Sequence, residues 1–158
     1  MAKDNNKLAD ADAKLLLHLA ELETCLGTPL VPGELVTWFD TVATALADLQ
    51  PILRRQTTER HRLQFDQIMR EDPALQRSVE HLRADDEALM DLLQSLQSQA
   101  VGFAAKAAAI EPDEALMGQE WTRFVDEGLW FVIRVRKQDT AIHTWLGEAL
   151  NRERGTGD

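Results

Sequence analysis

Residues 71–96 read EDPALQRSVEHLRADDEALMDLLQSL. Asp72 before Pro73 predicts that one helix stops there and that a second begins with a capping carboxylate and a proline in its first turn. Beyond this junction the apolar residues recur at steps of three and four, as in an α-helix with one buried face. These residues are Val79, Leu82, Leu89, Leu93 and Leu96. Asp86 takes the one position in the series where an apolar residue is expected.

The same signals divide the rest of the chain. Glycine and proline gather in only two further places, residues 27–33 and 111–113, where Asp113 could cap a helix. The sequence therefore predicts one all-α domain over 1–158, an antiparallel up-down four-helix bundle. Its expected helices span 8–26, 34–70, 73–108 and 113–151. Pro51 is expected to kink or split the second helix, and residues 152–158 are expected to form a flexible tail.

Composition narrows the classes of function. The 158 residues carry a formal net charge of −10, which disfavours nucleic acids and anionic membranes as partners. Cys25 is the single cysteine, so an intramolecular disulfide or a cysteine-based zinc site is excluded. The N-terminal residues lack the basic start and apolar stretch of a signal peptide, and we expect a cytoplasmic protein. Glycine-rich phosphate loops and nucleophile elbows are missing, so we expect no enzyme.

Polar residues interrupt three of the four apolar stripes. They are Gln56, Arg60, Asp86 and Gln138. Counting from the turns places all four within about one helical turn of the same level in an antiparallel bundle. We therefore expect them to meet in one buried polar layer, which is costly unless every group finds a partner.

The chain resembles the hemerythrin-like family on several short motifs. The proline-opened helix with Leu82-Arg83-Ala84-Asp85-Asp86 is similar to the family's Leu-x-x-Glu-His segment, and residues 138–142 are similar to its His-Glu-x-x-Glu segment. Gln56 and Arg60 fall on its His-x-x-x-Glu pair, and residues 155–158 resemble the tail of some members. The resemblance covers roughly residues 38–158. It implies a non-haem iron centre that binds oxygen or related small molecules.

The positions that would hold iron in the family are substituted here. Gln56, Gln138 and Asp86 replace histidine ligands, while Arg60 and Ile142 replace carboxylates. A guanidinium cannot bind iron, and its charge repels a cation. We therefore expect a degenerate site without a cofactor, in which Arg60 pairs with Asp86. The expected function is a non-enzymatic interaction, small-ligand or regulatory module with an unknown protein or small-molecule partner.

Two further possibilities remain open. A working iron centre could use an unusual ligand set drawn from His18, Glu59, Asp86 and Asp139, although His18 is expected to lie far from the layer. The other histidines, at positions 61, 81 and 143, fall beside their stripes and are expected to be solvated. Trp121 and Trp130 lie off the apolar stripe of the fourth helix, so this aromatic surface could face a ligand or form a homodimer.

Overall fold

The computed structural model describes the backbone of residues 2–31, 33–109 and 114–155. Side chains are described for residues 10–31, 33–109 and 117–152. Within these ranges all regular structure is helical, which confirms the predicted all-α class. The elements are α1 (Ala2–Gly27), α2 (Leu35–Arg55), the π-helix η1 (Gln56–His61), α3 (Arg62–Glu71), the 3-10 helix η2 (Pro73–Leu75), α4 (Gln76–Ala107) and α5 (Glu114–Gly155).

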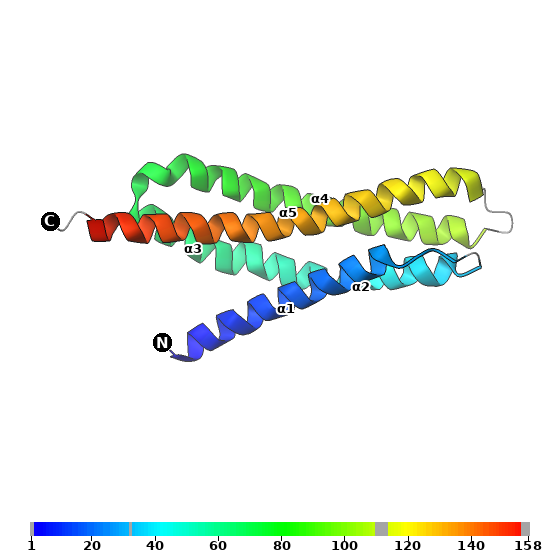
Figure 1. Ribbon diagram of the computed structural model, residues 1–158, viewed down its shortest axis with the longest axis horizontal. Coiled ribbons are helices and arrows are strands. Elements are labelled where there is room, and N and C mark those ends of the chain that lie inside the picture. Colours follow the sequence, from blue (N-terminus) through cyan, green and yellow to red (C-terminus); the bar gives the residue numbers. More distant parts are fainter. Residues whose placement is uncertain (1, 32, 110–113, 156–158) are drawn as a thin grey trace.

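Four long helical passes run along the same axis. One of them is the continuous run of α2, η1 and α3, and Figure 1 shows it passing between the turn after α1 and the turn before α4. Around the bundle α1 packs on α2 and α5, while α4 packs on the same two elements from the other side. The N-terminal half of α1 diverges from the other helices in Figure 1. As a result, α1 covers only part of the bundle's length.

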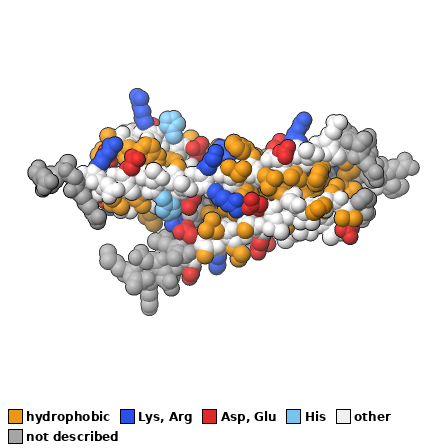
Figure 2. Space-filling model, in the orientation of Figure 1, with side chains coloured by type: hydrophobic (Ala, Val, Ile, Leu, Met, Phe, Trp, Pro, Cys, Tyr) orange, Lys and Arg blue, Asp and Glu red, His pale blue; other side chains and the backbone are white. Residues whose placement is uncertain are grey.

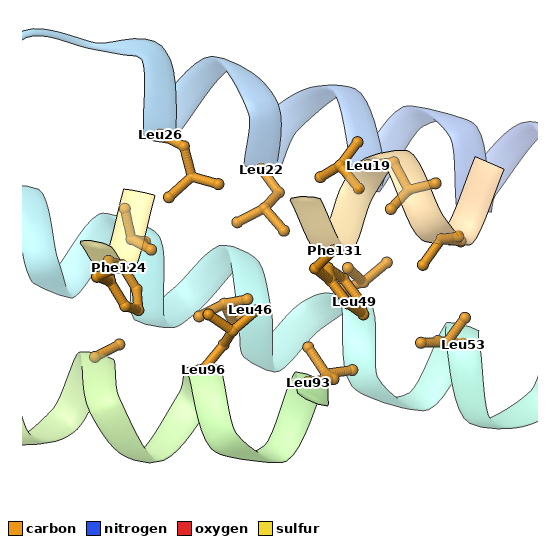
Figure 3. Packing of buried hydrophobic residues seen from close by; sticks show 14 of the residues in the cluster. Leu19, Leu22, Leu26, Leu46, Leu49, Leu53, Leu93, Leu96, Phe124 and Phe131 are labelled. Carbon is orange, nitrogen blue, oxygen red and sulfur yellow. The ribbon is translucent and has the colours of Figure 1, made fainter. Parts of the chain in front are cut away.

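The larger apolar core fills the part of the bundle that all four passes share. Its leucines and phenylalanines point inward from α1, α2, α4 and α5 (Figure 3). The labelled members are Leu19, Leu22, Leu26, Leu46, Leu49, Leu53, Leu93, Leu96, Phe124 and Phe131. Most of them are wholly shielded from solvent, and burying one such side chain contributes about 1.5–3 kcal/mol.

A second, smaller core lies beyond the reach of α1. It consists of Phe65, Ile68, Leu75, Val79, Leu82, Ile142 and Ala149. These residues come from α3, η2, α4 and α5, so this end of the bundle is built from three helical passes. The two cores leave a level between them where buried polar side chains lie.

The junction before α4 forms as its sequence predicts. The Asp72 carboxylate accepts a hydrogen bond from the Ala74 backbone N–H at 3.0 Å, directly before Pro73. Arg152 Nη1 donates to the same carboxylate at 2.7 Å and ties the end of α5 to this turn. The helix therefore continues to Gly155 through part of the expected tail, while residues 156–158 and the expected Asp113 cap lie outside the described residues.

Pro51 does not interrupt α2, which continues past it to Arg55. The departure from α-helical geometry comes five residues later, at the π-helix η1. Among the described residues, no helix combines the length and apolar character needed to cross a membrane.

Candidate functional site

The π-helix changes which residues of the second pass face inward. Before it, the buried positions Leu49, Leu53 and Gln56 follow the usual steps of four and three. The next buried residue is His61, five positions further on, and the usual steps resume at Phe65. A π-helical turn accommodates one extra residue, so every later side chain rotates by one position. The inward stripe therefore passes through His61 and not through Arg60.

Two expectations made on a regular helix are wrong for this reason. On a regular helix the inward stripe through Gln56 and Arg60 would continue at Leu63, which is 59% exposed. His61 was expected to be solvated and is 3% exposed. The histidines at positions 81 and 143 are exposed as expected, and each contacts a backbone carbonyl of its own helix.

The centre of the polar layer is a three-residue network across η1, α4 and α5. His61 Nδ1 lies 2.9 Å from both carboxylate oxygens of Asp86. Gln138 Nε2 donates to Asp86 Oδ1 at 2.9 Å and to the Leu82 carbonyl at 2.7 Å. Two N–H groups thus converge on one carboxylate, which fixes the proton of His61 on Nδ1. Gln56, Asp86 and Gln138 are each at most 6% exposed, as the sequence predicts for three of the four layer residues.

Arg60 lies beside this network and has a different partner from the one expected. It forms an ion pair with Asp12 of α1, whereas Asp86 is paired with His61. The Gln56 amide also donates to Asp12 Oδ1, at 3.4 Å. Burial lowers the pKa of the Arg60 guanidinium, and the charge of Asp139 opposes this shift. The predicted Arg60–Asp86 pair is therefore replaced by two pairs, one in the core and one at its edge.

The alternative metal ligands do not come together. Glu59 is exposed and pairs with Arg55 at 3.0 Å, and His18 contacts Glu21 on its own helix at 3.1 Å. Within the described part of the chain, no three histidine, cysteine, aspartate or glutamate side chains form a group that could hold a metal ion. Asp86 uses both oxygens on His61, and Asp139 lies close enough to Arg60 to influence its pKa.

A cavity of about 600 Å³ adjoins the layer. It lies between the first part of α1 and the end of α2 with the π-helix. Its wall combines apolar groups, three basic side chains and two acidic ones. They are Asp10, Ala11, Lys14, Pro51, Ile52, Arg55, Gln56, Glu59, Arg60 and Leu63. Gln56, which is buried in the layer, and Arg60, which lies at its edge, both line this wall, so the cavity adjoins the layer at these two residues.

Sequence reasoning missed two residues of this site. His61 was missed because a π-helix has no simple sequence signature and shifts the stripe by one residue. Asp12 was missed because its contact with Arg60 depends on how α1 crosses the bundle, which counting residues from a turn does not reveal. An acidic residue one helical turn before the buried Leu15 was the available signal, since a buried Arg60 needs a carboxylate.

Comparison with protein-family models, with curated proteins and with solved structures finds no match to this chain.

Proposed function

We propose that this chain is a non-enzymatic binding module that takes a small organic anion into the cavity between α1 and the π-helix. It is further proposed to be a cytoplasmic, degenerate relative of hemerythrin-like up-down bundles in which a polar layer replaces iron. The observation that carries the binding proposal is the position of Gln56 and Arg60. Gln56 is buried and the Arg60 side chain is 13% exposed, yet both line the cavity.

The chemistry of the wall supports a carboxylate with an apolar body. The guanidinium of Arg60 has five N–H donors in a fixed planar arrangement, so it can donate to a second carboxylate as well as to Asp12. Lys14 adds a second positive charge and Asp10 a negative one, while Arg55 and Glu59 neutralise each other. Pro51, Ile52 and Leu63 supply apolar surface for the remainder of the ligand. The cavity volume falls within the usual range for small-molecule sites, about 300–1,000 Å³.

A working iron centre is the competing function, but the described residues offer few free ligand atoms for iron. The remaining unpaired ligand atoms among the described residues include His61 Nε2 and Asp139 Oδ1, which are two potential donors. The permanent charge of Arg60 beside Asp139 would repel a bound cation. Elemental analysis of protein purified anaerobically with excess iron tests this function. Near two irons per chain would replace the proposal made here.

Binding of octanoate, measured by isothermal titration calorimetry with octanamide as the uncharged control, tests the anion site. Octanoate should bind and octanamide should bind at least about tenfold more weakly, because a charge-assisted hydrogen bond contributes about 1.5–3 kcal/mol. Arg60→Gln should remove this difference. Arg62→Gln removes the same charge from an exposed residue outside the cavity and should leave the affinity difference between octanoate and octanamide unchanged. Equal affinity for both ligands in the unmodified chain would overturn the proposed anion site.

A further inference from the structure

The outer face of α5 carries four exposed residues in a self-complementary order. Asp126, Trp130, Ile133 and Lys137 follow one another at steps of four, three and four, so they share one side of the helix. Trp130 is 52% exposed and Ile133 is 42% exposed. The order of acidic, apolar, apolar and basic residues is symmetric about the midpoint between residues 131 and 132. We refer to these four residues as the α5 strip.

Neither charged residue of the α5 strip forms an ion pair with another described residue of the same chain. Asp126 has no ion pair or hydrogen bond with any described residue. Lys137 lies over the Trp130 ring, with its Nζ 5.5 Å from the ring centroid. Neighbouring basic residues differ, because Arg136 donates to Glu23 at 2.6 Å. Trp121 also differs from Trp130, since its ring is half-buried and packs against Trp38 with centroids 5.9 Å apart.

We propose that the α5 strip binds a second copy of this chain through an antiparallel pair of α5 helices. Reversing the strip places Trp130 against the second copy's Ile133. The same reversal places Asp126 against the second copy's Lys137, and each contact occurs twice across the two-fold axis. Isologous contacts of this kind require a surface that complements itself, which the order of the strip provides.

The surface beside the strip has room for the incoming side chains. A hollow of about 380 Å³ adjoins Ile133 and Lys137, and another of about 310 Å³ adjoins Trp130 and Lys137. The second hollow reaches between α4 and α5 to Leu82 and Leu89. On the face seen in Figure 2, hydrophobic side chains lie directly beside lysine and arginine side chains over the middle of the molecule. The second copy's Trp130 and Ile133 can therefore enter apolar hollows.

A second copy suits this strip better than an anionic partner. A nucleic acid or an acidic peptide would meet Asp126 as well as Lys137, and the chain carries a net charge of −10. A partner that repeats their order in reverse satisfies both charges of the strip. The contact involves one helix from each copy, so it lies at the small end of protein interfaces and predicts a weak, concentration-dependent dimer.

Sedimentation velocity of the full chain at several concentrations tests the dimer, with ionic strength near physiological so that long-range repulsion is screened. Asp126→Lys and Lys137→Glu should each weaken dimerisation about tenfold or more, because two favourable charge contacts become repulsive. A mixture of the two variants should recover the dimer, because opposite charges then face each other. The double variant Asp126→Lys/Lys137→Glu should recover it as well.

Asp91→Lys makes the same charge change as Asp126→Lys at an exposed position of α4 and should leave the dimer intact. Circular dichroism of each variant checks that the helices are retained. If the chain stays monomeric at every concentration at which it is soluble, the proposal is wrong, and the α5 strip would then be a surface for a different protein. A dimer that is insensitive to Asp126→Lys and to Lys137→Glu overturns it equally, because that dimer uses a different surface.

Discussion

His61 Nδ1 lies 2.9 Å from each carboxylate oxygen of Asp86, and both side chains are buried between the two apolar cores. Gln138 supplies a further donor to the same carboxylate, so Asp86 joins η1, α4 and α5 at one level. Apolar residues at this level would allow neighbouring stripes to slide by a turn. A polar network with fixed partners specifies one register, although it need not add net stability.

Replacing His61 with Leu should destabilise the chain by about 1–3 kcal/mol, because the Asp86 carboxylate stays buried and loses its contact with the His61 ring. Replacing Asp86 with Leu should be similarly costly. The double variant His61→Leu/Asp86→Leu should recover most of the loss, since an apolar pair has no buried charge. Urea unfolding followed by circular dichroism measures the three free energies of unfolding. Strictly additive losses in the double variant would contradict the proposed coupling.

Replacing Arg60 with Met should cost only about 1 kcal/mol or less, which separates its function from that of His61. The Asp12 side chain is 33% exposed, so water can solvate its carboxylate once the guanidinium is lost. The comparison with His61→Leu by the same urea titration is decisive. A loss as large as that of His61→Leu would place Arg60 in the core network.

Deleting Thr58, an exposed residue of the π-helix, should leave the bundle folded. A π-helical turn contains one residue more than the α-helix, so the deletion restores regular geometry while His61 stays inward. The change in the free energy of unfolding should stay within about 1 kcal/mol. Deleting Arg83, an exposed residue within α4, provides the control. That deletion rotates the following stripe by about 100° and should unfold the chain.

The all-α class and the junction before α4 could be predicted from the sequence because their signals are local and agree with one another. The Asp72 and Pro73 junction and the apolar steps of α4 each specify the same helix boundaries. The buried polar character of Gln56, Asp86 and Gln138 was also evident, because each interrupts an apolar stripe.

The partners within the layer could not be predicted in the same way. They depend on the π-helix, which moves His61 into the position expected for Arg60. A shift of one residue changes the partner of Asp86 from a guanidinium to an imidazole. It also moves Arg60 to the wall of the cavity, where its contact with Asp12 depends on how α1 crosses the bundle.

The rate at which Cys25 is alkylated should depend on pH differently in the folded and the unfolded chain, because the thiol is partly buried in the folded chain. Burial raises the pKa of the Cys25 thiol, and the Glu21 carboxylate raises it further. The thiolate is the reactive form, so the iodoacetamide rate of the folded chain should rise at higher pH than that of the chain unfolded in urea. The pKa of Cys25 is higher in the folded chain than in the unfolded chain. The free energy of unfolding should therefore fall as the pH rises from the unfolded pKa through the folded pKa. Coincident pH profiles would contradict this expectation.

Gly128 of α5 packs closely against α1, because a Cβ atom added there would lie 2.7 Å from Leu26 Cδ1. Alanine at Gly102 of α4 meets no such neighbour and should stabilise the chain by about 0.5–1 kcal/mol through helix propensity. Gly128→Ala makes the same chemical change but must displace the buried Leu26 side chain, and overpacking typically costs about 1–3 kcal/mol. The thermal midpoint should therefore rise for Gly102→Ala and fall for Gly128→Ala. A rise in both variants would show that α1 can move away from α5 at little cost.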